Sequence, residues 1–315
     1  MALDITEANA VSSKYFDKTL TPQVYEQSPL FAKLKKNNQV TWDGGTQIQF
    51  PIRHTKMNRA ETVETTEQIV FTNTETRTSG VLDWKKYVSQ AMITWQQQIE
   101  NGGRAQIVNL LRDKTEELRD DMFNKFHTDL YATTQATPSF SSLDTIIDAT
   151  TTYAGIAVAD AAEWLAIEDT AETILHYYNS STCLSRRINQ ATFGIDKPNL
   201  IITTRDLASK IKGDLEPQKR YENNEMANMG FSNVEFESIP VIGDYACPAG
   251  YMFGICTKYW EFRYHPDYNF VTTPWKDLFQ AGFPHHMVKV TTWVGNIVCR
   301  MRKVNFKYTA LDYTA

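Results

Sequence analysis

The stretch RAQIVNLLRDKTEELRDDMFNKFHTDLY, residues Arg104 to Tyr131, decides the fold of this chain. It contains neither proline nor glycine, and its apolar residues recur at spacings of three and four, the period of an amphipathic helix. These residues are Ile107, Leu110, Leu111, Leu118, Met122, Phe126 and Leu130. At about 1.5 Å per residue such a helix is roughly 40 Å long, well above the average for proteins. The sequence therefore predicts a spine helix over residues 104–131.

The remaining positions of this stretch are crowded with charge. Glu116-Glu117 and Asp120-Asp121 are paired acids, but sequence neighbours on a helix point about 100° apart, so neither pair converges on one substrate. Lysine and arginine are interleaved with them, a pattern typical of a solvated or intersubunit ion-pair face. The residues predicted to contact a neighbouring subunit here are Arg112, Glu116, Arg119 and Asp120.

The chain before the spine helix is polar and has few apolar anchors. The runs TQIQFPIRH and VLDWKKYVSQAMITW alternate polar with apolar residues, and a Thr- and Glu-rich segment lies between them. We predict one long two-stranded hairpin over residues 46–96 with its tip near 57–78. An isolated hairpin is marginally stable in water, so this one needs a neighbouring molecule. Residues 1–45 are predicted to form an extended arm with one short helix starting at Ser28-Pro29.

The chain after the spine helix has the pattern of an ordinary mixed α/β unit. Residues 144–190 are predicted to be mainly helical, PNLIITT to be a buried strand, and DLASKIKGDL to be a helix capped near Thr204. NVEFESIPVIGD and GYMFGICTKYWEFRYH are predicted strands, and residues 213–230 a polar loop. Residues 288–308 alternate well and predict a terminal β-hairpin turning at Gly295-Asn296.

Composition narrows the class of protein. The 315 residues are 42% apolar and 22% charged, which are globular values, and the length favours about two domains. The net charge of −5 argues against a protein that condenses a genome by covering phosphates. The start MALDITEANA does not resemble a signal peptide, and no run approaches the ~18–20 apolar residues of a membrane span, so we expect a soluble protein with no membrane partner.

The residues of catalytic and metal sites are scattered. The four cysteines form no CxxC and are expected to be reduced, buried thiols: Cys183, Cys247, Cys256 and Cys299. His285-His286 would face opposite ways on a strand. No Walker-type loop, GxGxxG or GxSxG occurs. The sequence therefore indicates no cofactor and no metal, and an enzyme is poorly supported. A hydrolase using carboxylates such as Glu163 and Asp169 remains the alternative from another class.

Opposite charges follow one another on the predicted hairpin. Three cations come first and three acids follow at once, which cancels the field that a nucleic acid would feel. Such a loop suits contact with an adjacent subunit of complementary pattern. The predicted contact residues are Arg53, Lys56, Arg59, Glu61, Glu64 and Glu67.

The order of these segments resembles one family. SPLFAKLKKNNQVTWDGGTQIQFPIRH, the polar hairpin, LDWKKYVSQAMITWQQQIENGG and the long helix are followed by YAGI, PNLIITTRDL, GFSNVEFESIPVIGDYACPAGYMFGI and WVGNIVC. Over nearly the whole chain this is similar to a major capsid protein of tailed bacteriophages with the Hong Kong ninety-seven-like capsid fold, of class α+β.

The resemblance implies a division of the chain. Residues 1–45 would be the N-terminal arm and 46–100 the extended loop that overlaps an adjacent subunit. Residues 101–144 and 281–315 would form the peripheral domain with spine helix 104–131, and 145–280 the axial domain around the five-fold and six-fold axes.

The resemblance also implies a role and partners. The chain would self-assemble as hexamers and pentamers into an icosahedral shell that encloses double-stranded DNA without binding it sequence-specifically, and it would be assembled in the host bacterial cytoplasm as part of the virion. Because the arm is short, a separate scaffolding protein is expected; a portal and decoration proteins are further partners. An encapsulin-like compartment shares the fold and is the nearest alternative.

Overall fold

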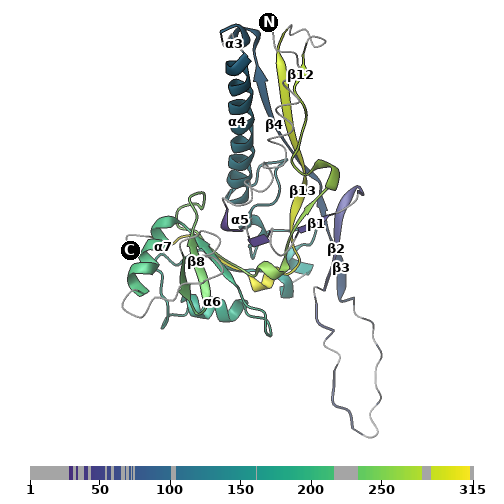
Figure 1. Ribbon diagram of the computed structural model, residues 1–315. Coiled ribbons are helices and arrows are strands. Elements are labelled where there is room, and N and C mark those ends of the chain that lie inside the picture. The colour runs from purple at the N-terminus through teal and green to yellow at the C-terminus, as the bar shows by residue number, and fades with distance from the viewer. Residues whose placement is uncertain are drawn as a thin grey trace.

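The computed structural model describes residues 28–30, 33–34, 39–41, 44–53, 55–57, 60–64, 68, 71, 73, 75–100, 104–160, 162–215, 233–278 and 285–312. The predicted spine helix is confirmed, because α4 spans Arg104–Leu130 and is the long upright helix of Figure 1. Its apolar stripe is buried, with Leu118, Met122 and Phe126 at most 2% exposed. The short helix α3 (Trp95–Glu100) precedes it. The apolar stripe read from the sequence is thus the face by which α4 joins the core.

The sheet beside α4 is built on one long strand, β13 (Met287–Cys299). β4 (Lys85–Ile93) and β10 (Trp260–Tyr264) pair antiparallel with β13, and β1 (Gln39–Thr41) adds in parallel to β10. The short strands β11 (Val271–Thr272) and β12 (Lys276–Asp277) also pair with β13. Tyr87, Phe126 and Trp293 pack ring against ring between helix and sheet, so aromatic contacts fix α4 on this sheet.

The predicted terminal hairpin is wrong. β13 runs straight through Gly295-Asn296, and residues Phe306–Tyr308 form β14 in another sheet. A Cβ at position 295 would stand 2.4 Å from the Arg263 carbonyl oxygen and 2.5 Å from the Trp293 ring. Glycine is therefore needed here for a close approach inside a strand, whereas the sequence pattern reads the same residue as a turn.

The second sheet forms a separate layer with its own helices, at the lower left of Figure 1. Its strand order is β5-β14-β9-β6-β8-β7. The predicted strand PNLIITT, the helix DLASKIKGDL and the strand pair NVEFESIPVIGD are confirmed, and Thr204 Oγ1 accepts a hydrogen bond from Leu207 N at 3.2 Å as the predicted cap. The bounds are β5 Ile167–Asp169, β6 Leu200–Thr203, β7 Asn233–Phe236, β8 Ile239–Gly243, β9 Met252–Ile255, α6 Leu184–Ala191 and α7 Arg205–Leu215.

The prediction that residues 144–190 are mainly helical is wrong. They hold most of the one-turn helix α5 (Leu143–Ile146), part of α6, and turns. Asp148 Oδ1 accepts hydrogen bonds from Thr150 N and Thr151 N, and Asp169 Oδ1 accepts them from Ala171 N and Glu172 N. These side chains take up backbone donors that a helix would need, so turns replace it. The 3₁₀ turns among the described residues are η1 Val158–Asp160, η2 Ala162–Trp164, η4 Thr257–Tyr259, η5 Pro266–Tyr268 and η7 Arg302–Val304.

The projecting hairpin exists but is shorter than predicted. β2 (Gln47–Arg53) and β3 (Arg77–Asp83) pair along their full length, and Figure 1 shows them pointing away from the body. The chain leaves the hairpin at Trp84, whose Nε1 donates to Gly45 O at 2.9 Å, and β4 then joins β13 instead. The hairpin therefore covers residues 47–83 rather than 46–96.

Two predicted segments fall largely outside the described residues. Of the arm, residues 1–27 lie outside them, while Leu30 and Leu34 are buried and helical at the predicted short helix. Residues 216–230 of the predicted polar loop also lie outside them.

Two buried cations tie β14 and η7 to α5 and the turn that follows it. Lys307 of β14 is 2% exposed, and its Nζ lies 2.7–3.1 Å from carboxylate oxygens of Asp144, Asp148 and Glu168. Arg302 is 1% exposed and donates to the carbonyl oxygens of Ile146, Thr151 and Asp148. Because each cation has several oxygen partners, its burial is compensated.

Candidate functional site

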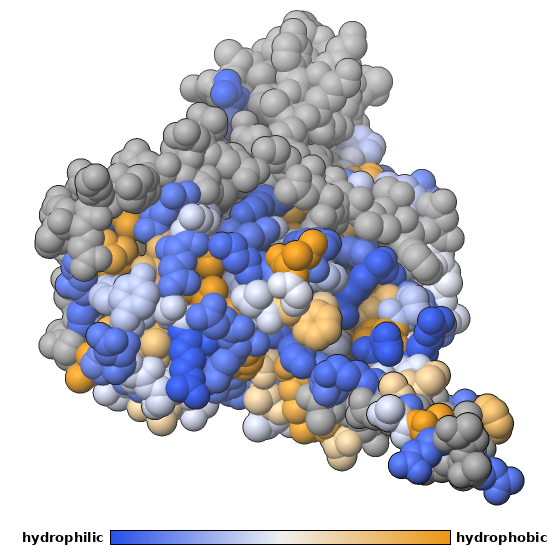
Figure 2. Space-filling model, turned by 90° about the horizontal axis from the view of Figure 1, so that it is seen from below, coloured by the Kyte–Doolittle hydropathy of each residue, from blue (hydrophilic) through white to orange (hydrophobic). Residues whose placement is uncertain are grey.

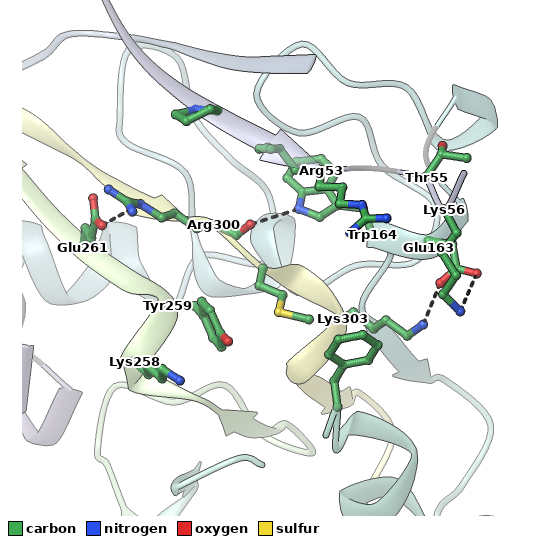
Figure 3. Close-up of a pocket in the computed structure, with 14 residues that line it drawn as sticks. Arg53, Thr55, Lys56, Glu163, Trp164, Lys258, Tyr259, Glu261, Arg300 and Lys303 are labelled. Carbon is green, nitrogen blue, oxygen red and sulfur yellow. Dashed lines mark hydrogen bonds and ion pairs between the residues drawn. The ribbon is translucent and has the colours of Figure 1, made fainter. Parts of the chain in front are cut away.

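A groove of about 680 Å³ lies at the base of the projecting hairpin (Figure 3). Its wall combines the end of β2, the turn η2 and the segments around η4 and η7, and more than 200 residues of sequence separate β2 from η4 and η7. Trp164 closes one side, and its Nε1 donates to Arg300 O at 3.4 Å. The cations that line the groove are Arg53, Lys56, Lys258, Arg300 and Lys303.

Glu163 is the first of three carboxylates that hold these cations. Its two oxygens lie 3.1 Å from Lys303 Nζ and 3.6 Å from Lys56 Nζ. The hydrogen bond and charge of Lys303, and then the charge of Lys56, lower the pKa of Glu163. One carboxylate therefore serves two ammonium groups, one from the hairpin and one from η7.

Glu261 of β10 clasps two arginines. Arg263 donates to its Oε2 through Nε and Nη2 at 2.9 and 2.8 Å, and Arg300 Nε lies 2.6 Å from its Oε1. Arg263 is 2% exposed, donates to Gln49 O at 3.2 Å, and stands over the Phe50 ring. The buried arginine thus anchors β2, while the half-exposed Arg300 faces the groove.

Asp196 fixes a tight turn at the rim. Its oxygens accept from Lys258 Nζ at 2.7 Å and from Tyr259 OH at 2.5 Å, and these bonds lower the pKa of Asp196. Phe193 and Asp196 close the turn by two backbone hydrogen bonds. The turn presents Ile195, which is 95% exposed, beside the half-exposed Phe193. The turn thus holds two exposed apolar side chains next to the groove.

The structure brings some of the predicted contact residues together and separates others. Arg53 and Lys56 lie in the groove, and Glu61 and Glu64 are exposed farther along the loop. Arg59 and Glu67 lie outside the described residues. The four predicted residues of α4 sit on a separate element and pair with each other, Arg112 with Glu116 at 3.1 Å and Arg119 with Asp120 at 3.3 Å.

Sequence reasoning missed the other half of the groove. Arg300 and Lys303 lie in the short basic run RMRK, residues 300–303, and Lys258 lies in a turn 42 residues earlier, so no pattern links them to the hairpin. Only the tertiary fold places them together.

A second exposed surface lies on the side of β4 that faces away from α4. Tyr87, Ala91 and Ile93 of β4 point into the core, whereas Val88 and Met92 alternate outward at 61% and 47% exposure. The following helix α3 adds Trp95 and Ile99 at 50% and 64%. On the face seen from below in Figure 2, by contrast, apolar and polar residues are interspersed. The strip on β4 and α3 has the character of an interface.

Neither carboxylate of the alternative hydrolase suits a general acid. Glu163 is held by Lys303 and Lys56, and Asp169 is held by Arg187 Nη2 at 2.5 Å. Burial alone would raise the pKa of Asp169, but the hydrogen bonds of Arg187 and two backbone N–H groups lower it. Both groups are paired anions, so the geometry does not favour proton donation at neutral pH.

The described residues hold no group of His, Cys, Asp and Glu side chains able to bind a metal, and the four cysteines are free and buried as predicted. His285 has a positive φ of 62°, and its carbonyl accepts from Gln98 Nε2 at 2.7 Å, so it closes a turn rather than extending a strand. No described helix is long and apolar enough to cross a membrane.

No protein-family model and no curated protein sequence matches the chain. Solved structures do. A chain of the cyanophage A-1(L) capsid asymmetric unit matches with a TM-score of 0.59 at 12% identity, covering 94% of this chain and 95% of that one. A chain from Mycobacterium phage Cain matches with 0.58 at 11%, covering 100% of both. A chain of the satellite phage P4 procapsid including size determination (Sid) protein matches with 0.51 at 12%, covering 98% and 97%.

Likeness at this identity shows the fold, and it does so over nearly the whole chain. The predicted α+β, Hong Kong ninety-seven-like capsid fold is therefore confirmed.

Proposed function

We propose that this chain is a major capsid protein of a tailed phage, a structural shell protein rather than an enzyme. The observation that carries the proposal is that phage capsid chains share its fold from end to end. A fold by itself hosts many functions, so the surfaces must support the role as well. They do: a hairpin projects from the body, and apolar side chains are exposed along β4 and α3.

The proposed assembly follows the division of the chain made from its sequence. Residues 1–45 act as the arm, the hairpin within 46–100 as the extended loop, residues 101–144 and 281–315 as the peripheral domain, and 145–280 as the axial domain. Hexamers and pentamers of such subunits close an icosahedral shell around double-stranded DNA in the host cytoplasm. The separate layers around α4 and around α7 support the division into two domains.

The proposed contacts between subunits lie on three surfaces: the hairpin, α4, and the exposed strip on β4 and α3. Arg53, Lys56, Glu61 and Glu64 lie on or beside the projecting hairpin and face outward, and Arg59 and Glu67 belong to the same loop by sequence. On α4, Arg112 pairs with Glu116 and Arg119 with Asp120. Because these exposed charges are already paired within one helix, we expect them to add little to the contact between subunits. The strip of Val88, Met92, Trp95 and Ile99 supplies apolar area for a second copy of this chain.

Partners other than the chain itself belong to the same proposal. A scaffolding protein, a portal and decoration proteins would act during assembly. One of the matched structures, the P4 procapsid, includes a size determination protein. No cofactor or metal is required by this role.

Electron microscopy with light-scattering mass tests the proposal, on the purified protein alone and after co-expression with neighbouring genes. Closed shells, or rings of five and six subunits, are the expected result, and dense DNA inside particles separates a virion from an encapsulin-like compartment. A compact monomer of 36.1 kDa under both conditions would contradict the proposal.

A further inference from the structure

The groove at the hairpin base carries more positive charge than its own carboxylates balance. Among the described residues, five cations and two carboxylates line it, and the buried Arg263 already binds Glu261 through two nitrogens. Around Glu163, Lys56 and Lys303 share a single carboxylate, as Figure 3 shows. The carboxylates therefore hold the cations in place without neutralising them, and the groove attracts anions.

Arg53 adds a cation that no carboxylate holds. It makes no hydrogen bond or ion pair within the described part of the chain, and it stands opposite Arg77 in the β2–β3 ladder. Both arginines are exposed, and like charges directly opposite each other destabilise a strand pair. An anion bound beside Arg53 would reduce this repulsion. A guanidinium group also presents a fork of N–H donors that matches the oxygens of a phosphate group.

The cations stand on separate elements around one space. Arg53 and Lys56 belong to the hairpin, Lys303 to η7, and Arg300 to the segment between β13 and η7. The side chains of Lys56, Arg300 and Lys303 are 55%, 47% and 31% exposed, so a ligand can reach them. The volume of about 680 Å³ is that of a small-molecule site rather than of a nucleic-acid duplex. A small ligand with two or more phosphate groups uses this arrangement better than a single anion does.

An exposed aromatic ring beside these cations favours a nucleotide as the carrier of the phosphates. Phe193 is 47% exposed, and the Lys303 ammonium group lies 5.5 Å from the centre of its ring. Trp164 and Met301 add apolar wall to the same groove. Bases stack on aromatic side chains while neighbouring cations bind the phosphates, which is how proteins hold single-stranded nucleic acid. A ligand that carries carboxylates alone would leave the ring unused.

We propose that the groove binds a nucleotide through two or more phosphate groups, with its base on Phe193. The phosphates contact Arg53 and Lys56 of the hairpin and Arg300 and Lys303 of the body, so the ligand ties the hairpin to the body. A free nucleoside polyphosphate and a short single strand share this chemistry of a base beside neighbouring phosphates. The inference does not depend on the proposed function.

Titration calorimetry on the purified full chain tests the site with ATP, tripolyphosphate, citrate and a thymidine decanucleotide. ATP should bind with a Kd below about 1 mM, at least about threefold tighter than tripolyphosphate and about tenfold tighter than citrate. Phe193→Leu should remove the preference for ATP and leave tripolyphosphate binding unchanged. No binding of ATP at about 1 mM, or equal affinities for ATP and either of the simpler anions, would overturn the inference. Tighter binding of the decanucleotide than of ATP supports a single strand as the ligand, and the reverse order supports a free nucleotide.

Two matched arginine variants show whether the groove itself binds the ligand. Arg53→Gln and Arg77→Gln remove the same charge and the same Arg–Arg repulsion, but only Arg53 lines the groove. Arg53→Gln should raise the Kd for ATP about tenfold, and Arg77→Gln less than about twofold.

A third variant should act in the opposite direction, which a loss of folding cannot imitate. Glu163→Gln should lower the Kd for ATP about threefold, because Lys56 and Lys303 then face the ligand without a competing carboxylate. Equal effects of the two arginine variants, or weaker binding by Glu163→Gln, would overturn the inference.

Discussion

Two places in the molecule hold lysines in different ways: the junction between β14 and α5, and the groove at the hairpin base. At the junction, Lys307 is 2% exposed and three carboxylates surround its ammonium group. In the groove, Lys303 and Lys56 share the single carboxylate of Glu163, and the Lys56 side chain is 55% exposed. A cation saturated within the chain stabilises the fold, whereas a cation left with charge to spare attracts another molecule. The number of in-chain oxygen partners separates the two roles.

Replacing Lys307 should have the largest effect on stability. Lys307→Met removes the charge that Asp144, Asp148 and Glu168 share, and leaves buried carboxylates without a counter-ion. Breaking a buried ion pair from one side costs about 3–5 kcal/mol. Urea unfolding of the unassembled subunit, followed by circular dichroism, measures this loss.

Lys303→Met is the matched control, since it removes a lysine from the groove edge, where Lys56 still faces Glu163. The unfolding midpoint of this control should hardly move. Equal losses from the two substitutions would show that the division between structural and associative cations is wrong.

Gly295→Ala should have the second-largest effect on stability, because it adds an atom where the interior has no room. The added Cβ meets the Arg263 carbonyl at 2.4 Å and the Trp293 ring, so β13 or the ring must shift. Overpacking of this kind costs about 1–3 kcal/mol. Gly213→Ala in α7 has open space around its Cβ and should instead stabilise by about 0.5–1 kcal/mol, since alanine favours a helix. Thermal unfolding of both variants checks the opposite signs.

The elements that sequence reasoning found are those whose pattern is local. The apolar period of α4, the continuous apolar run of β6 and the cap of α7 lie within single stretches, and each was recovered. The errors arose where a distant contact overrides the local pattern. Gly295 has the signature of a turn but lies in a strand beneath Trp293. Asp148 and Asp169 lie in a stretch with helical composition but bind backbone donors as turns.

The candidate groove was only half predictable for the same reason. Arg53 and Lys56 are predicted contact residues because they precede a run of acids in one stretch of sequence. Lys303 and Lys258 reach the same groove from η7 and η4, and no pattern in the sequence connects these two turns with the hairpin. Charge patterning thus locates one wall of an interface, and tertiary structure is needed to find the facing wall.

Acid should destabilise the junction around Lys307 as the pH falls from about 4 to about 2. Burial alone would raise the pKa of Asp148, but hydrogen bonds from Lys307 and Thr150 lower it from 3.8 to about 2. Because the pKa is lower in the folded chain, the stabilisation is present above about pH 4 and is lost as the pH falls towards 2. The unfolding free energy of the wild type should drop between these values, and Asp148→Asn should show a shallower drop. Identical slopes in the two proteins would remove Asp148 from this account.

Ile195 should have the smallest effect on the fold and a visible one on association. The side chain is 95% exposed, so Ile195→Ser should leave the unfolding free energy within about 0.5 kcal/mol of the wild type. If the rim packs on a second copy of the chain, losing this apolar area should raise the concentration for half assembly about threefold. Ile174→Ser removes another exposed isoleucine, 43% exposed and away from the groove lining, and should not change assembly. An equal response of both variants would mean that assembly depends on the overall hydrophobicity of the surface, and that Ile195 is not part of a specific contact.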